Sequence, residues 1–147
     1  MAFKTTLETA LKSLQKDFRP PGSGGETGEY YLKMIEEVRD ALSGFEAGAF
    51  EIVGFVWMQG WNDMVSQEAT AEYEANLVNF VKDVRTEFSS PGLPFVIGEL
   101  GNGGPALEGS GMSKFREAQK RAVEKIERAE FVGTQKFSRP KELSPNT

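Results

Sequence analysis

The sequence predicts a single α/β domain built on a small parallel sheet flanked by helices. Two short apolar runs, at residues 50–58 and 94–100, have the β-branched and aromatic content of buried strands. Segments with apolar residues at helical spacing precede and follow these runs. Strands that alternate with helices pair in parallel through right-handed crossovers. A chain of 147 residues with 39% apolar residues has the size of one domain, so residues 1–147 are expected to share one core.

The first third of the chain is expected to contain two helices separated by a loop. Leu7, Leu11 and Leu14 recur at helical spacing within residues 5–15. Residues 17–25 hold two prolines and three glycines and are predicted to form a loop. Thr27 is expected to cap a second helix that ends near residue 44. The apolar side of that helix consists of Tyr31, Met34, Ile35, Val38 and Leu42.

The remaining elements alternate as a parallel sheet requires. Residues 50–58, FEIVGFVWM, are predicted to form a strand that is buried on both faces. A long helix over residues 69–88 precedes the second strand, and a glycine-rich loop over 101–111 precedes a further helix. Residues 131–137 indicate a third, weaker strand. Because so small a sheet has two open edges, we expect either self-association into a homo-oligomer or a missing portion of the fold.

Composition excludes several classes of function. The net charge is −5, and the basic residues are scattered among acidic ones, so nucleic-acid binding is not expected. The chain has no apolar run of about 18 residues and no signal-peptide pattern at its start, so we expect a cytoplasmic protein without a membrane partner. It contains no Cys and no His, which removes thiolate chemistry, the commonest general base and the commonest zinc ligand. No metal and no cofactor are predicted, and the turn GELGNGG matches no phosphate-binding loop.

The segments that follow the two strands are the candidate site, because ligands of parallel sheets bind at the carboxyl ends of strands. These segments are residues 59–63 and 99–104. Gly60 would let the backbone approach a ligand closely. Trp61 lies beyond the strand end and is either a sugar-stacking surface or a packing residue, whereas Trp57 lies inside the strand and is expected in the core.

The motif Gly60-Trp61-Asn62-Asp63, preceded by Trp57 and Gln59, resembles a conserved block of the SGNH hydrolases, and among them the sialic-acid acetylesterase-like carbohydrate esterases. The resemblance extends from residues 16–21 through 97–104 to 138–146. It implies a three-layer, flavodoxin-like α/β/α fold and removal of acetyl groups from sugars by a Ser nucleophile with an Asp-x-x-His pair. It also implies that the ligand is an acetylated carbohydrate or another small-molecule ester.

The same resemblance suggests roles for individual residues. Gln59 or Asn62 would supply the side-chain donor of an oxyanion hole, which stabilises an acyl-transfer transition state by ~3 kcal/mol. Gly60, Trp61 and Arg19 would contact the substrate. The chain departs from the family because it lacks the N-terminal Gly-Gln-Ser-Asn turn and any His. The fold is therefore expected to be incomplete, and a carboxylate or a lysine would have to serve as the base.

Four residues are candidates for the missing catalytic groups. Ser23 and Ser110 each stand between glycines and could expose a hydroxyl, although such serines are usually ordinary loop residues. Asp63 and Glu99 follow the two strands and could act as a carboxylate pair. Alternatively, Asp63 caps a helix or pairs with Arg19, and Glu99 accepts hydrogen bonds from loop N–H groups.

Three functional hypotheses follow. The first is an ester hydrolase with a non-standard or incomplete catalytic set. The second is a catalytically inactive, self-associating remnant of an SGNH esterase that binds a sugar or acyl ligand. The third, which has least support in the sequence, is glycosidic or metal-assisted hydrolysis by Asp63 and Glu99.

Overall fold

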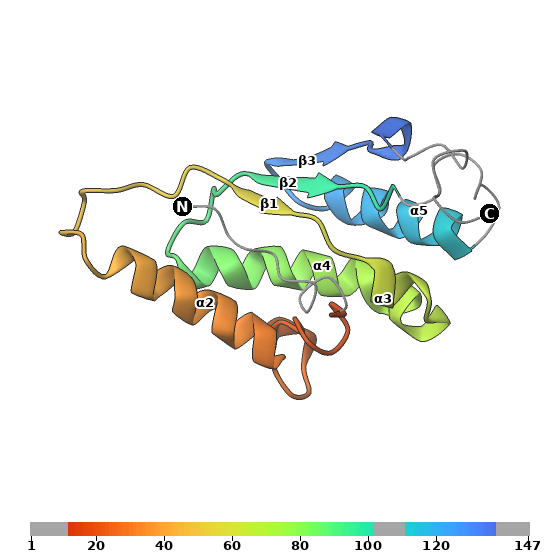
Figure 1. The fold of residues 1–147 in the computed structure, drawn as a ribbon, viewed down its shortest axis with the longest axis horizontal. Coiled ribbons are helices and arrows are strands. Elements are labelled where there is room, and N and C mark those ends of the chain that lie inside the picture. The colour runs from red at the N-terminus through yellow and green to blue at the C-terminus, as the bar shows by residue number, and fades with distance from the viewer. Residues whose placement is uncertain (1–11, 102–110, 138–147) are drawn as a thin grey trace, which may run out of the picture.

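The protein folds as a three-stranded parallel sheet with helical crossovers, seen in a computed structural model that describes residues 12–101 and 111–137. The strands are β1 (Phe55–Trp57), β2 (Phe95–Gly98) and β3 (Ala129–Val132), in the spatial order β1-β2-β3. Phe55 pairs with Phe95, and Phe95 pairs with Ala129 (Figure 1). The predicted α/β class and the parallel pairing are thus confirmed, as a small and incomplete version of the α/β/α fold.

Among the residues that the structure describes, four α-helices accompany the sheet. They are α2 (Glu29–Leu42), α3 (Trp61–Met64), α4 (Gln67–Glu87) and α5 (Gly111–Glu124), with short 3-10 turns η1 (Pro21–Ser23) and η3 (Gln135–Phe137). Ser66 begins α4 by accepting a hydrogen bond from the N–H of Ala69 at 3.2 Å, the usual role of an N-cap hydroxyl. Helices α4 and α5 form the two crossovers. Within the described residues, no helix is long and apolar enough to cross a bilayer.

The core lies between the sheet and helices α4 and α5, which pack on the same face (Figure 1). Phe95 and Ile97 point toward these helices and are buried, as is Trp57, which confirms its predicted core position. The ring of Trp57 lies 4.4 Å from that of Phe80 on α4 and 5.2 Å from that of Phe18. The residues that the structure describes therefore form two layers, a sheet and the helices on one side of it.

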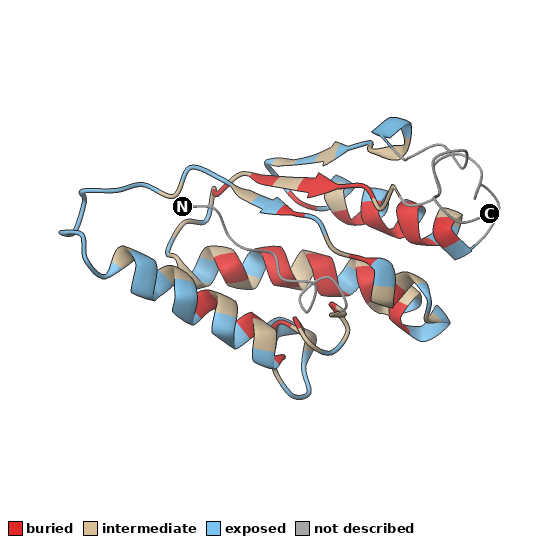
Figure 2. Ribbon diagram, viewed as in Figure 1, coloured by how far each residue is buried: buried red, intermediate tan, exposed pale blue. Residues whose placement is uncertain are grey.

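The prediction of a strand over residues 50–58 that is buried on both faces is wrong. Only Phe55–Trp57 are extended, and Val56 and Met58 are 66% and 70% exposed. Because successive side chains of a strand point to opposite faces, Val56 points away from the helices. Figure 2 shows the loop before β1 as exposed, in contrast to the largely buried β2. The apolar run thus supplies one buried face and leaves the other uncovered among the described residues.

Other boundaries also differ from the predictions. Of the helix expected over residues 5–15, the first seven positions lie outside the described residues, and Leu14 and Gln15 form a turn. Helix α2 is capped by Gly28 in place of Thr27. A Cβ atom at Gly28 would stand 2.2 Å from the carbonyl oxygen of Asp17, so only glycine fits there. The third strand is Ala129–Val132, earlier than expected, and the loop 102–110 lies outside the described residues.

Candidate functional site

The candidate site lies where β1 and β2 end. Residues 59–63 follow β1, with Gly60 as the N-cap of α3, and Glu99 follows β2. A Cβ atom at Gly60 would stand 2.5 Å from two ring atoms of Phe115 on α5. The glycine is therefore required by the packing of the strand end against α5, a reason different from the predicted approach of a ligand.

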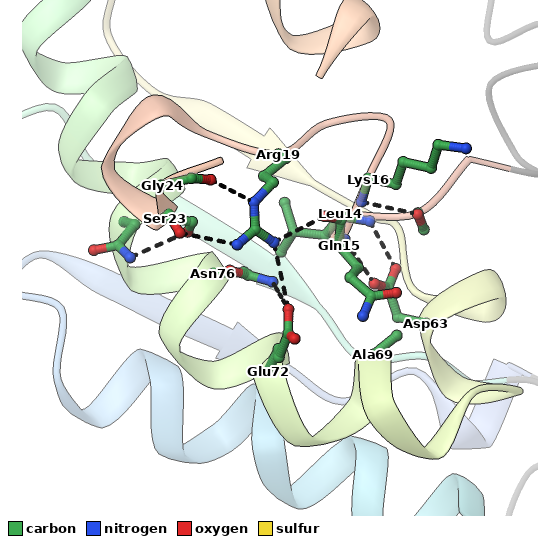
Figure 3. A network of polar contacts seen from close by, with 12 residues as sticks. Leu14, Gln15, Lys16, Arg19, Ser23, Gly24, Asp63, Ala69, Glu72 and Asn76 are labelled. Carbon is green, nitrogen blue, oxygen red and sulfur yellow. Dashed lines mark hydrogen bonds and ion pairs between the residues drawn. The ribbon is translucent and has the colours of Figure 1, made fainter. Parts of the chain in front are cut away.

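Asp63 is the central polar group of the strand end. Its side chain is fully buried and accepts hydrogen bonds from the N–H of Leu14 at 2.8 Å and the N–H of Gln15 at 3.0 Å (Figure 3). It also accepts a hydrogen bond from Nε2 of Gln59 at 2.7 Å. Burial raises the pKa of the Asp63 carboxyl above its ordinary value, although these three donors favour the ionised form. The charge of Asp17 acts in the same direction as burial. Asp63 thus fastens the segment before η1 to the end of β1.

Gln59 completes this attachment. Its Nε2 donates to the carbonyl of Lys12 and to Asp63, both at 2.7 Å, which uses both amide hydrogens. Its Oε1 is buried without a hydrogen-bond partner among the described groups. The backbone carbonyl of Gln59 accepts a hydrogen bond from the hydroxyl of Tyr73 at 3.0 Å. The oxygen of that hydroxyl in turn accepts a hydrogen bond from Nε1 of Trp57 at 3.3 Å. Tyr73 could not be singled out from the sequence, because it falls in the apolar stripe of a predicted helix.

Trp61 and Asn62 occupy a different part of the same segment. Gln59 and Asp63 are four residues apart and turn inward together, whereas Trp61 begins α3 and is 40% exposed. Asn62 is partly exposed. Among the predicted site residues after β1, Trp61 is therefore the most exposed, Gln59 and Asn62 are partly exposed, and Asp63 is buried.

Arg19 and Ser23 belong to a second network, beside α4. The guanidinium of Arg19 donates to the carbonyls of Gly24 at 2.7 Å and Ser23 at 2.9 Å, and Nη1 lies 3.3 Å from Glu72 Oε2 (Figure 3). Oγ of Ser23 accepts from Nδ2 of Asn79 at 3.1 Å. Arg19 therefore holds the proline- and glycine-rich loop in place, and Ser23 and Asp63 lie at opposite ends of the network in Figure 3. Ser110 lies outside the described residues.

Glu99 holds the segment that follows β3. Its carboxylate accepts hydrogen bonds from the N–H of Thr134 at 3.0 Å and from Nε2 of Gln135 at 2.8 Å. Its backbone carbonyl accepts a hydrogen bond from Oγ1 of Thr134 at 2.7 Å. This agrees with the alternative that Glu99 accepts loop N–H groups. For Asp63 the alternatives were a helix cap or an ion pair with Arg19, but Gly60 is the cap and Arg19 pairs with Glu72.

Asp63 and Glu99 do not share partners, because their hydrogen bonds go to segments before η1 and after β3, respectively. In residues 12–101 and 111–137, no three acidic side chains converge as metal ligands would. The arrangement therefore gives no support to a joint catalytic or metal-binding role for the two carboxylates.

Two buried polar residues of α5 also shape the strand end. Gln119 donates to the carbonyl of Gly98 at 3.2 Å and accepts the N–H of Leu100 at 3.0 Å, and Nε of Arg116 donates to the carbonyl of Leu100 at 2.8 Å. Sequence reasoning missed both residues. The available signal was their position: Gln119 and Arg116 stand within the apolar stripe that contains Phe115, Ala118 and Ala122.

A parallel sheet with α4 and α5 as crossovers, and a polar segment at the end of β1, defines a small α/β domain. The family model described as carbohydrate esterase, sialic acid-specific acetylesterase, matches residues 8–143, so the chain belongs to this family. A search of curated proteins finds no match.

The fold is also found in a solved structure. The crystal structure of a protein from Arabidopsis thaliana superposes with a TM-score of 0.65 at 20% sequence identity. The match covers 84% of this chain and 44% of the Arabidopsis protein. The present chain thus spans less than half the length of that protein, and at this identity the likeness concerns the fold alone.

Proposed function

We propose that the protein is an ester hydrolase that acts on acetylated carbohydrates or related small-molecule esters. The observation that carries the proposal is the family match over residues 8–143, which includes the whole strand-end segment. The reaction consumes one water molecule and yields acetate and a sugar hydroxyl. Substrate would lie over the carboxyl ends of β1 and β2, as in other parallel α/β sheets.

Asn62 is the proposed donor to the oxyanion that forms when the ester carbonyl is attacked. Both amide hydrogens of Gln59 are donated within the fold, which assigns Gln59 to positioning. Trp61, 40% exposed, is the proposed surface on which a sugar ring stacks. Asp63 and Gln59 then act as positioning residues, which fix the backbone that presents Trp61 and Asn62.

Glu99 is the proposed general base. A carboxylate offers about four lone-pair sites, and the contacts of Glu99 with Thr134 and Gln135 use two of them. It could take a proton from a water molecule that attacks the ester, and the alkoxide that leaves would take up the proton. Ser23 is a second candidate for the attacking group, although its hydroxyl lies beside Asn79 on α4.

Initial rates on p-nitrophenyl acetate and on an acetylated sugar test this proposal. Asn62→Ala should lower kcat roughly 100-fold, as the loss of an oxyanion donor does. Glu99→Gln should lower the rate, and Ser23→Ala should leave it unchanged if water attacks directly. Gln67→Ala, which removes an exposed amide at the start of α4, is the matched control and should retain the wild-type rate. Equal rates for all variants would contradict the assignment.

A second candidate is a non-catalytic protein that binds the same ligands. The internal use of Gln59 and Asp63, together with the absence of His from the sequence, favours it. It predicts no hydrolysis above the buffer rate, while an acetylated sugar still changes the fluorescence of wild-type protein but not that of Trp61→Phe.

A further inference from the structure

The pairing of β1 with β2 stops early, although its register could continue. Trp57 pairs with Ile97, so two residues further along the chain Gln59 would stand opposite Glu99. The N–H of Glu99 donates to the carbonyl of Val132 on β3 at 2.9 Å, so the backbone groups on either side of Glu99 point to the β1 side. The chain turns into α3 after β1 (Figure 1), and those groups therefore need another partner.

Gln119 of α5 is that partner. Its Nε2 donates to the carbonyl of Gly98 at 3.2 Å, and its Oε1 accepts a hydrogen bond from the N–H of Leu100 at 3.0 Å. In a continued parallel ladder, the backbone N–H and carbonyl of Gln59 would bind these same two groups. The side-chain amide of Gln119 thus occupies the place that the next paired residue of β1 would take. Gln119 is fully buried, so water does not compete for the two hydrogen bonds.

The displaced carbonyl of Gln59 is bound by α4. It accepts a hydrogen bond from the hydroxyl of Tyr73 at 3.0 Å, and Tyr73 is fully buried as well. Burial raises the pKa of this hydroxyl, while hydrogen-bond interactions with Trp57 and Gln119 act in the opposite direction. The phenol therefore stays protonated at neutral pH and remains a donor. Tyr73 and Gln119 form one buried link that reaches the ends of both strands.

An aromatic contact holds the two strand ends apart beside this link. The ring of Phe115, four residues before Gln119 on α5, lies 4.4 Å from the ring of Tyr73. The same ring fills the space in front of Gly60, where an added Cβ would stand 2.5 Å from two of its atoms. Because a packed interior deforms little, α4 and α5 together fix where the segment after β1 lies relative to the end of β2.

We propose that Gln119 is a positioning residue of the hydrolase, which separates the ends of β1 and β2 and so sets Glu99 and Asn62 at the distance that one ester group requires. The inference rests on the proposed function, in which Asn62 donates to the oxyanion and Glu99 is the base. Gln119 acts through the two backbone groups that flank Glu99. A displacement of about 1 Å at a reacting group can lower the rate roughly 100-fold, so the effect should be visible in kcat.

Steady-state hydrolysis of p-nitrophenyl acetate by Gln119→Met tests the proposal, because this change keeps the length of the side chain and loses both hydrogen bonds. Its kcat should fall about tenfold or more, with KM within about twofold of the wild-type value. Asn76→Leu is the matched control: it also replaces a buried amide, but Asn76 contacts Glu72 on α4, away from the strand ends. It should retain the wild-type kcat. Urea unfolding gives the folded fraction by which each rate is corrected.

Gln119→Glu supplies a readout that a loss of stability would not produce. A protonated carboxyl can donate to the carbonyl of Gly98 and accept from the N–H of Leu100, whereas the ionised form places an oxygen against that carbonyl. The ratio of variant to wild-type kcat should therefore rise as the pH falls from about 8 to about 5, since burial raises the pKa of a carboxyl. The surrounding titratable and charged groups are the same in both proteins: Tyr73, Asp63, Glu99 and Arg116.

A wild-type kcat in Gln119→Met, or a ratio for Gln119→Glu that does not change with pH, would overturn the inference and leave the hydrolase proposal intact. A wild type that does not hydrolyse the ester would overturn the hydrolase proposal, and amide hydrogen exchange would then decide whether the link exists. In Gln119→Met, the N–H of Leu100 and that of Met64, which donates to the carbonyl of Gly60, should both exchange at least about tenfold faster. Faster exchange at Leu100 alone would show that the two strand ends are not linked.

Discussion

Replacing Asp63 by Asn should destabilise the protein more than the same replacement at a less buried carboxylate. Asp63 is fully buried and receives three N–H donors, two of them from a backbone segment about 50 residues earlier. The substitution keeps the shape of the side chain but replaces one acceptor oxygen with a donor NH₂. One of the three donors must then face another donor.

The magnitude follows from the lost contact and the removed charge. A hydrogen bond to a charged group contributes about 1.5–3 kcal/mol to stability. The variant also no longer buries a charge, and the desolvation cost avoided in this way offsets part of the loss. We therefore expect Asp63→Asn to lower the free energy of unfolding by about 1–2 kcal/mol. Asp63→Ala removes all three contacts and leaves the N–H of Leu14 and one of the two amide hydrogens of Gln59 without a partner, so about 3–4 kcal/mol is expected.

Urea unfolding followed by tryptophan fluorescence measures these changes, because Trp57 is buried beside the strand end. Asp83→Asn is the matched control: Asp83 accepts one backbone hydrogen bond, from Gly22 at 2.7 Å, in a more exposed setting. It should cost less than about 0.5–1 kcal/mol. If Asp63→Asn unfolds at the same urea concentration as Asp83→Asn, the carboxylate does not hold the segment in the manner described.

Three further predictions concern the same region. Gly60→Ala should destabilise the fold by about 1–3 kcal/mol in urea unfolding, since the added Cβ would clash with the Phe115 ring. Gly44→Ala should be near neutral, because no atom lies within 4 Å of a Cβ added there. Arg19→Lys should cost about 1–2 kcal/mol, because an ammonium cannot reach the loop carbonyls and the carboxylate that the guanidinium bridges; full stability of this variant would contradict that role. Burial raises the pKa of the Asp63 carboxyl in the folded state. The favourable contribution of this carboxyl to folding is therefore fully present below the unfolded-state pKa of about 3.9 and is lost as the pH rises through the folded-state pKa. The stability difference between wild type and Asp63→Asn should grow from pH 7 to pH 4, and a difference that shrinks would mean a lowered pKa.

The sequence predicts the fold class and the order of strands and helices well because these depend on local patterns. The apolar stripe of α4 and the run PFVIGEL each indicate one element, and both occur as expected. The extent of β1 could not be obtained in this way. An apolar run of nine residues does not reveal that, among the described residues, no layer covers one side of the strand, so Val56 and Met58 are predicted to be buried.

The hydrogen bonds of the candidate site could not be obtained from the sequence. The rule that ligands bind at the carboxyl ends of parallel strands selects the segments that contain Asp63 and Glu99, and that selection stays a prediction. A sequence does not show that Leu14 and Gln15 present their N–H groups to Asp63, since those contacts join residues nearly 50 positions apart. The same limit applies to Arg19, whose contacts with its own loop become visible only when the loop is folded.

The spacing within residues 59–63 decides which of them can serve a ligand. Gln59 and Asp63 are four residues apart and so share one face of a helical turn, and that face is turned toward residues 12–15. Trp61 and Asn62 fall between them, and Trp61 is exposed and Asn62 partly exposed. In the proposed function, Gln59 and Asp63 therefore hold the preceding chain, and Trp61 and Asn62 contact the substrate. Gln59 and Asp63, whose hydrogen bonds go to residues 12–15, are for this reason assigned to positioning.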